Sequence, residues 1–286
     1  MDPIGKLNFK SDSTILILKE AIRRGVNTFV CSPDDLTLIN NFIYVNCKRV
    51  IFKDSVLTFK SDKRIKIKKL DYFFIRQDPP FNLNYLTNCY LLELHQRFNK
   101  KPQFVNDPSG IKNFTEKIFP MYFHKVMPHT LVTSDERVFK EYLLKNNFLI
   151  LKTLYNKGGE GVVKVSKNER NALKKFAKLK NTYGVPVVIQ EFLSEVSDGD
   201  KRVILLNGEP AGLINRIPRK GHFKANLHLG GKAEVSKLTK KELEICRLIK
   251  PHLKKTDGVM IGRAAYHTPY LLADIEREIF YNNNIP

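Results

Sequence analysis

The residues best suited to chemistry surround a glycine-rich segment in the middle of the chain. Lys152 lies in an apolar run at 148–154, and Gly158, Gly159 and Gly161 follow it. Glycines allow backbone N–H groups to approach phosphate oxygens closely, and a lysine ammonium adds a compact positive charge. The segment lacks the G-x-x-x-x-G-K-[ST] pattern of a P-loop, and its glycines precede a strand, unlike those of a dinucleotide-binding turn. Alone, it fits either a phosphate-binding loop or an ordinary glycine-rich hairpin.

Three further groups of polar residues follow in the order that a nucleotide site needs. Residues 190–193 close an apolar strand, where the Glu191 carboxylate could accept from ribose hydroxyls while the backbone pairs with adenine. Residues 198–202 place charges of both signs at the start of a strand. Arg216 lies at a strand end before Asn226, and a guanidinium there suits a phosphate oxygen. Taken singly, each group is also what a surface loop would contain.

The elements that must position these residues follow a different pattern in each half of the chain. Up to about residue 113, strands and helices alternate, which predicts a parallel α/β sheet. Beyond it, the pattern predicts an α+β arrangement with antiparallel strands around the glycine-rich loop. Helices are predicted at 12–25, 85–98 and 168–183, and a strand and a capped helix share 130–147. Strands are predicted at 26–32, 45–52, 70–81, 102–107, 148–154, 156–166 and 185–193, with a hairpin at 200–217 around Asn207–Gly208.

The composition fits a folded protein without membrane spans. The chain has 286 residues, enough for one large or two ordinary domains, and 42% of them are hydrophobic. No apolar run approaches the roughly 20 residues that a bilayer span needs, and the N-terminus lacks the apolar core of a secretory signal. The cysteines form no Cys-x-x-Cys pair, which predicts free thiols in a reducing compartment and a cytoplasmic protein. They are Cys31, Cys47, Cys89 and Cys246.

The positive charge raises the question of a nucleic-acid partner. The chain has 49 Lys and Arg against 29 Asp and Glu, for a formal net charge of +20. Most of the basic residues are lysines spread over the whole length, with short clusters at 63–69 and 174–180. Base readout favours arginine, and phosphate contacts favour clustered charges. The composition therefore argues against nucleic acid and remains compatible with anionic substrates.

Over residues 1–255, the order and spacing of these features resemble the bacterial-type glutathione synthetases of the ATP-grasp superfamily. The matching stretches are MDPI (1–4), DS (12–13), RRG (23–25), RQDPPF (76–81), EKIF (116–119), PHTLVTS (128–134), ILK (150–152), DGDKRV (198–203), NGEP (207–210), RIP (216–218) and NLHLGG (226–231). The resemblance implies a fold of mixed α/β and α+β class. This would be an ATP-grasp fold with an N-terminal parallel α/β (pre-ATP-grasp) domain, and the fold would be truncated at both ends. It implies an N-terminal α/β substrate domain at 1–112 and an ATP-grasp domain at 113–255. The lid would cover about 113–190, and the second half 190–255.

The resemblance also implies a reaction and a set of site residues. ATP would phosphorylate the cysteinyl carboxylate of γ-glutamylcysteine, and the amine of glycine would attack the acyl phosphate. The residues implied to contact ATP are Lys117, Lys152, Gly158, Gly159, Gly161, Gln190, Glu191, Phe192, Leu193 and Asp200. Those implied for catalysis at the transferred phosphate are Arg216, Lys201, Arg202 and Asn226. Those implied to bind γ-glutamylcysteine are Arg76, Asp78 and Ser13. The family is commonly oligomeric, so a homo-oligomer is expected.

The last 31 residues depart from this resemblance. The family continues with an acidic residue and a Glu-x-Asn pair that hold Mg²⁺, whereas residues 256–280 read TDGVMIGRAAYHTPYLLADIEREIF. That segment resembles the tRNA-dihydrouridine synthases, in which the Gly262–Arg263 turn would meet the phosphate of FMN. The family implies Mg²⁺, but no metal ligand is assigned, because Asp274, Glu276 and Glu278 fit a solvated helix face.

We therefore expect 256–286 to be a foreign tail and the chain to be an impaired glutathione synthase. Three alternatives stay open at this point. The chain could be a dihydrouridine synthase fragment fused to an inactive ATP-grasp remnant. It could be a non-catalytic basic binding module, or the product of an artefactual join at 255/256.

Overall fold

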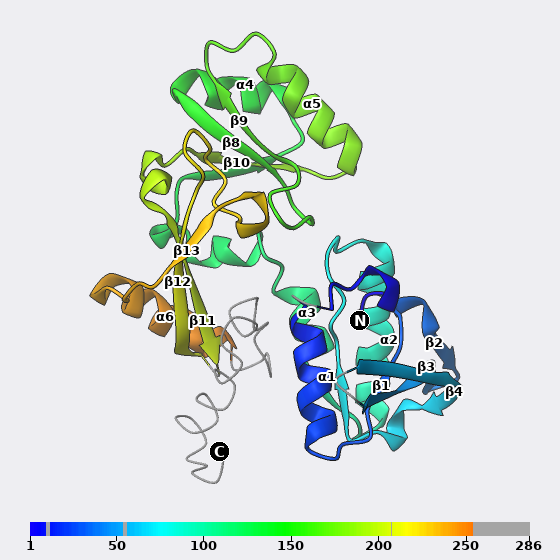
Figure 1. The fold of residues 1–286 in the computed structure, drawn as a ribbon. Coiled ribbons are helices and arrows are strands. Elements are labelled where there is room, and N and C mark those ends of the chain that lie inside the picture. The colour runs from blue at the N-terminus through cyan, green and yellow to red at the C-terminus, as the bar shows by residue number, and fades with distance from the viewer. Residues whose placement is uncertain (10–11, 54–55, 207, 254–286) are drawn as a thin grey trace.

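The computed structural model describes residues 1–9, 12–53, 56–206 and 208–253, with the N-terminal part and the ATP-grasp part side by side (Figure 1). The tail expected at 256–286, with Asp274, Glu276, Glu278 and the Gly262–Arg263 turn, lies outside the described residues. Within the described ranges, no helix has the length and apolar character needed to cross a membrane.

The first helix, α1 (Ser13–Arg23), begins after Asp12, whose carboxylate accepts a hydrogen bond from the Thr14 N–H at 2.7 Å. This cap satisfies one of the N–H groups that the first helical turn leaves free. Gly25 follows the last turn with φ +76°, a left-handed conformation that glycine adopts at little steric cost. The helix predicted at 12–25 is confirmed.

The larger N-terminal sheet is antiparallel, which corrects the prediction of a parallel sheet. Its strand order is β1-β3-β2, and β4 also pairs with β3. The bounds are β1 (Phe29–Val30), β2 (Leu36–Ile39), β3 (Phe42–Lys53) and β4 (Val56–Lys66). A two-residue turn, with Asn40 at φ +55°, joins β2 to β3, and so short a turn joins only antiparallel strands. The prediction missed β2 and β4, and therefore missed both hairpins.

The parallel pair found in the described residues is β5 (Tyr72–Phe74) with β6 (Gln103–Val105). The connection between them contains α2 (Leu83–Phe98), and α3 (Pro108–Asn113) follows β6. Apolar side chains of β3 and α2, including Ile43 and Leu92, pack with Phe104 of β6 in one buried cluster. The alternation of strand and helix therefore predicts this small parallel unit correctly.

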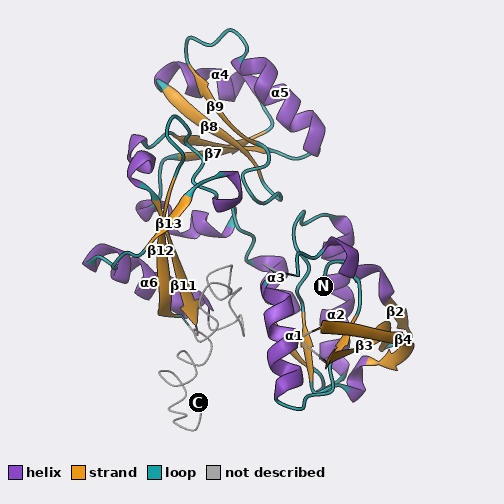
Figure 2. Ribbon diagram, viewed as in Figure 1, coloured by secondary structure: helices purple, strands orange, loops and turns teal. Residues whose placement is uncertain are grey.

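The part predicted to be the lid, a name kept below for these residues, is a four-stranded antiparallel sheet with two helices on one face (Figure 2). Its strand order is β7-β10-β8-β9, and the elements predicted between 130 and 193 are confirmed. They are β7 (Thr130–Thr133), α4 (Glu136–Lys145), β8 (Phe148–Thr153), β9 (Val162–Ser166), α5 (Ala172–Tyr183) and β10 (Val187–Glu191). Phe139 of α4 and Phe176 of α5 are fully buried and stacked, with ring centroids 4.6 Å apart. Alternate residues of the strands meet this core, so the opposite face of the sheet is available for a site.

A buried hydroxyl in this core provides a stability prediction. Thr153 is 2% exposed, and its Oγ1 has no hydrogen-bond partner among the described residues. Such a group keeps its desolvation penalty, so Thr153→Val is expected to raise the free energy of unfolding by about 1 kcal/mol. Thr133→Val is the matched control, because it removes a hydroxyl that accepts from the Asp135 N–H at 2.9 Å. Urea unfolding should separate the two variants, and an equal loss of stability in both would contradict the prediction.

The second half of the ATP-grasp part is a three-stranded antiparallel sheet in the order β11-β12-β13. The hairpin predicted at 200–217 is confirmed as β11 (Asp200–Leu206) and β12 (Glu209–Ile217), followed by β13 (Lys232–Glu234). A bulge between Ile204 and Leu205 shifts the register of the hairpin by one residue. The helix α6 (Lys240–Leu253) packs against β12.

Six short 3₁₀ helices complete the described elements. They are η1 (Ile4–Lys6), η2 (Pro33–Asp35), η3 (Ile67–Lys69), η4 (Phe119–Val126), η5 (Ser194–Asp198) and η6 (Leu227–Leu229).

Candidate active site

The glycine-rich loop between β8 and β9 is held by lysines from both sides. Lys117 donates from Nζ to the carbonyl oxygens of Asn156 at 2.8 Å and Leu154 at 3.4 Å. Lys224, from the second half, donates from Nζ to the carbonyl oxygen of Gly159 at 2.9 Å. The ammonium groups of Lys117, from the lid, and Lys224, from the second half, therefore lie at the same loop. Such a gathering of positive charge suits the binding of a polyphosphate.

Two of the loop glycines have a left-handed backbone and close neighbours. A Cβ on Gly159, at φ +80°, would lie 2.9 Å from Oδ1 of Asn226, and one on Gly161, at φ +64°, would lie 2.5 Å from Cγ2 of Thr153. The left-handed backbone favours glycine at both positions, and at Gly161 the buried Thr153 side chain also leaves no space for a Cβ. The contact also brings together two residues that the sequence predicts for the site, Gly159 and Asn226.

Lys152 lies on the face of the lid sheet opposite to α4 and α5, next to Gln190. Its Nζ donates to Oε1 of Gln190, whose amide nitrogen donates to Oγ1 of Thr130 at 2.8 Å. Burial is the main cause that lowers the pKa of Lys152, and the charge of Lys117 lowers it further. Two neighbouring ammonium groups that are partly removed from water favour an anion beside them. The structure thus brings together three of the residues predicted to contact ATP.

At the end of β10, the backbone N–H groups of Glu191 and Phe192 are both hydrogen-bonded to carbonyl oxygens of neighbouring segments. The Glu191 N–H donates to the carbonyl oxygen of His129 at 3.1 Å, and the Phe192 N–H donates to that of Phe148 at 3.3 Å. The ring of Phe192 lies under Lys164, whose Nζ is 3.4 Å from the ring centroid. Leu193, the last residue of the segment, is exposed. These contacts do not test the predicted adenine-binding role of residues 190–193, which stays a prediction.

Lys164 is a candidate that the sequence interpretation missed. It pairs in register with Ile150 across β8 and β9, and therefore lies on the same sheet face as Lys152 and Gln190. Alternation along residues 162–166 could have indicated this face, because Val163 and Val165 belong to the buried core of the lid.

In the second half, Arg216 and Asp200 face each other across the hairpin in a bidentate ion pair. Nε of Arg216 lies 2.5 Å from Oδ1 and Nη2 lies 2.7 Å from Oδ2 of Asp200. The Arg216 side chain is only 13% exposed, so this pair holds the guanidinium in one orientation. Arg202 lies two residues after Asp200 on the same side of β11 and is exposed.

Lys201 lies on the other face of this hairpin. Its register partner is Asn215, and its Nζ lies 2.9 Å from Oε1 of Glu242 in α6 and 3.1 Å from the carbonyl oxygen of Lys237. The structure therefore does not bring Lys201 together with Arg216. Its predicted catalytic role has no geometric support here, because the contacts of its side chain hold α6 to the sheet.

The residues predicted to bind the dipeptide lie on the N-terminal part. Arg76 donates from Nη2 to Oγ of Ser13 at 2.6 Å and from Nε to Oγ1 of Thr14 at 3.4 Å. Asp78 donates from its N–H to Oδ1 of Asp2 at 3.0 Å, and its carboxylate pairs with Lys157 of the glycine-rich loop. The structure thus brings Arg76 and Ser13 together, and it connects Asp78 to the loop.

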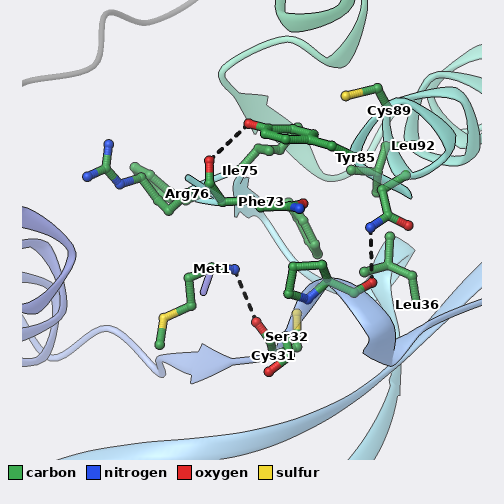
Figure 3. Close-up of a pocket in the computed structure, with 14 residues that line it drawn as sticks. Met1, Cys31, Ser32, Leu36, Phe73, Ile75, Arg76, Tyr85, Cys89 and Leu92 are labelled. Atoms are coloured by element: carbon green, nitrogen blue, oxygen red, sulfur yellow. Dashed lines mark hydrogen bonds between the residues drawn. The ribbon is translucent and has the colours of Figure 1, made fainter. Parts of the chain in front are cut away.

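The cavity behind Arg76 is too small for the dipeptide (Figure 3). Its volume is about 30 Å³, room for roughly one or two water molecules. Its wall includes Tyr85, whose hydroxyl donates to the carbonyl oxygen of Gln77 at 3.0 Å, together with Cys31 and Cys89. This cavity therefore gives no support to the predicted dipeptide site at Arg76.

The four cysteines provide a second prediction, on chemical reactivity. All are free, and burial raises the pKa of Cys47 to about 11 and that of Cys89 to about 12. Burial also raises the pKa of Cys31 and of Cys246. Because the thiolate is the reactive form, the native protein at pH 8 is expected to react with Ellman's reagent very slowly, and all four thiols should react in urea. Rapid modification of any thiol in the native protein would contradict this.

Among the described residues, no cluster of carboxylates forms the ligand set that Mg²⁺ would need without the phosphates of ATP. No group of three or more His, Cys, Asp or Glu side chains gathers within the described part of the chain. The carboxylate of Asp200 is already bound by Arg216.

The fold and this site together define an ATP-grasp protein. Solved structures of that fold resemble it at low sequence identity. An ATP-grasp protein with a RimK domain from Sphaerobacter thermophilus gives a TM-score of 0.52 at 13% identity, covering 85% of this chain and 77% of that one. A D-cycloserine synthetase gives a TM-score of 0.51 at 12% identity, covering 66% and 68%.

Sequence comparison narrows this class to one family. The N-terminal domain model of the prokaryotic glutathione synthetases matches residues 1–112, and their ATP-grasp domain model matches residues 116–263. Glutathione synthetases from Brucella melitensis and Agrobacterium fabrum are 36% and 35% identical over 265 residues; both matches cover 92% of this chain, and they cover 84% and 82% of those proteins. The chain belongs to the prokaryotic glutathione synthetase family and is an ATP-dependent ligase.

These comparisons do not support the other interpretations of the sequence. The ATP-grasp match continues to residue 263, past the junction expected at 255/256. The resemblance of residues 256–286 to dihydrouridine synthases is not shown by them, and they support a ligase instead of a non-catalytic basic module.

Proposed function

We propose that the chain joins γ-glutamylcysteine to glycine at the expense of ATP. The family membership supports this reaction, and the observation that carries it is the glycine-rich loop. This loop is in contact with Lys117 of the lid, Lys224 of the second half and Asp78 of the N-terminal part. A reaction that transfers a phosphoryl group from a nucleotide to a dipeptide carboxylate requires such a meeting of parts.

In the proposed reaction, the γ-phosphoryl group of ATP passes to the cysteinyl carboxylate, and the amine of glycine then displaces phosphate from the acyl phosphate. No protein nucleophile is needed, so the protein must align the reactants and stabilise the moving negative charge. Lys117, Lys152 and the loop amides would hold the phosphates, and Arg216 would neutralise charge at the transferred group. Arg76 would bind a carboxylate of γ-glutamylcysteine, with Ser13 orienting its guanidinium.

The remaining ATP contacts are proposed from the family resemblance. Gln190, Glu191, Phe192 and Leu193 would surround the adenine and ribose, and Asn226 would contact the phosphates beside Gly159. The family also uses Mg²⁺ with ATP, and we leave its ligands unassigned. A homo-oligomer remains our prediction from the family resemblance. A cytoplasmic location remains our prediction from the four cysteines, which are free in the structure.

The test of this proposal is ADP release, coupled to NADH oxidation, with ATP, Mg²⁺, γ-glutamylcysteine and glycine. ADP release is expected only when all of these are present, with glutathione as the product identified by mass spectrometry. ADP release that does not depend on glycine would contradict the ligase reaction. The same assay tests the expectation that this chain turns over slowly because its last residues depart from the family's Mg²⁺ ligands. Turnover close to that of the Brucella melitensis relative would contradict that expectation.

A further inference from the structure

The loop at 154–161 also joins the proposed dipeptide site to the proposed nucleotide site. Lys157 of this loop forms an ion pair with Asp78, which lies two residues after Arg76. Next to this pair, the Phe81 N–H donates to the carbonyl oxygen of Tyr155 at 3.0 Å, and the two rings lie 6.0 Å apart. Two segments that are distant in the sequence, 76–81 and 154–161, are therefore attached to each other.

Each segment is also attached to its own binding site. The segment at 76–81 contains Arg76, whose guanidinium contacts Ser13 and Thr14 of α1. The segment at 154–161 contains the glycines, and Lys117 and Lys224 bind its carbonyl oxygens. The contacts at Asp78 and Phe81 thus link the two sites in one continuous path.

The exposure of the ion pair indicates what it does. The side chains of Lys157 and Asp78 are 49% and 48% exposed. Ion pairs with this exposure add little to the stability of a fold, because water and salt screen them and long side chains lose entropy. The main effect of this ion pair is therefore on the relative position of the segments 76–81 and 154–161.

We propose that the Asp78–Lys157 ion pair couples the dipeptide and nucleotide sites, with Lys157 as a positioning residue. The inference rests on the proposed function. A dipeptide held at Arg76 orders the segment at 76–81, and the ion pair then orders the glycine-rich loop over the nucleotide. Because this ordering is shared, each ligand binds more tightly once the other is present, and linkage requires the two enhancements to be equal.

The test is calorimetric titration of the full chain with adenylyl imidodiphosphate and Mg²⁺, with and without γ-glutamylcysteine. In the wild-type protein, the dipeptide is expected to lower the Kd of the nucleotide about two- to fivefold, the range that an exposed ion pair supports. Lys157→Met is expected to keep both single-ligand Kd values within about twofold while losing this enhancement. The matched control is Lys175→Met, which breaks an exposed ion pair with Glu169 on the same lid and should keep the enhancement.

Ionic strength provides an independent readout. Raising NaCl to about 1 M reduces the Debye length to about 3 Å, so the wild-type enhancement should fall toward that of Lys157→Met, which should change little. An enhancement retained in Lys157→Met, or no enhancement in a wild-type protein that binds both ligands, would overturn the coupling and leave the proposed function intact. A wild-type protein that does not bind γ-glutamylcysteine at all would overturn the proposed function itself.

Discussion

Arg216→Met is expected to lower kcat/KM about 100- to 1,000-fold, the loss seen when one preorganised charge-stabilising group is removed from a transition state. The guanidinium is held in a bidentate pair with Asp200 and is 13% exposed, so in the proposed role it would meet the transferred phosphoryl group already oriented. Most of the effect should fall on kcat, because the charge that Arg216 is proposed to stabilise develops during phosphoryl transfer. Steady-state kinetics with all three substrates measures it.

Two variants separate this role from a structural one. Arg216→Lys keeps the charge and loses the bidentate geometry, so its activity should lie between those of the wild type and Arg216→Met. Arg247→Met removes an exposed arginine from α6, in the same half of the fold, and should retain wild-type kinetics. A loss of less than about fivefold in a folded Arg216→Met protein would contradict the assigned role, since a single transition-state contact is worth far more.

Lys152→Met is expected to raise the KM for ATP about 100-fold, because it removes the charge that is proposed to bind phosphate in a site partly shielded from water. Burial lowers the pKa of Lys152, so the charged form is disfavoured in the folded protein. The unfolded chain therefore binds more protons between the lowered pKa and the ordinary value of 10.5, and stability rises with pH in that window. Below that window the charged lysine costs stability, so Lys152→Met should be at least as stable as the wild type.

The pH profile adds a second signature for Lys152. Nucleotide binding should weaken as pH rises through the lowered pKa, because the ammonium is lost there, and Lys152→Met should lack this alkaline change. Lys140→Met, on the exposed face of α4, is the control and should bind nucleotide as the wild type does. A Lys152→Met protein with unchanged nucleotide affinity would remove Lys152 from the site.

The sequence predicts the lid well because each of its elements has a local signal. The helix at 136–145 begins after the Asp135 cap, and each strand is an apolar run with turn residues at its ends. The glycine-rich loop is predictable for the same reason, since its positive φ angles require glycine. The antiparallel N-terminal sheet was missed because strand direction depends on which hairpins close, and the turn at Asn40 lacks the usual glycine.

The ion pair between Arg216 and Asp200 shows why contacts between strands are harder to predict. A regular hairpin at Asn207–Gly208 would place Asp200 opposite Asn215, because Leu206 pairs with Glu209. The bulge after Ile204 moves the register by one residue and brings Arg216 opposite Asp200. No local signal predicts that shift.

The contact between Lys157 and Asp78 is a second example of a contact that no local sequence pattern predicts. It joins residues 79 positions apart in two loops, and it depends on how the N-terminal part and the ATP-grasp part meet. Neither residue type nor spacing indicates a partner, since both side chains are common on exposed loops.

The most direct test of the proposed reaction follows oxygen from substrate to product. γ-Glutamylcysteine labelled with ¹⁸O in its cysteinyl carboxylate is incubated with the chain, ATP, Mg²⁺ and glycine, and the products are analysed by mass spectrometry. An acyl phosphate intermediate requires one ¹⁸O atom in each phosphate released and the other in the new amide of glutathione. Unlabelled phosphate, or ADP release without glutathione, would contradict ATP-dependent ligation through that intermediate.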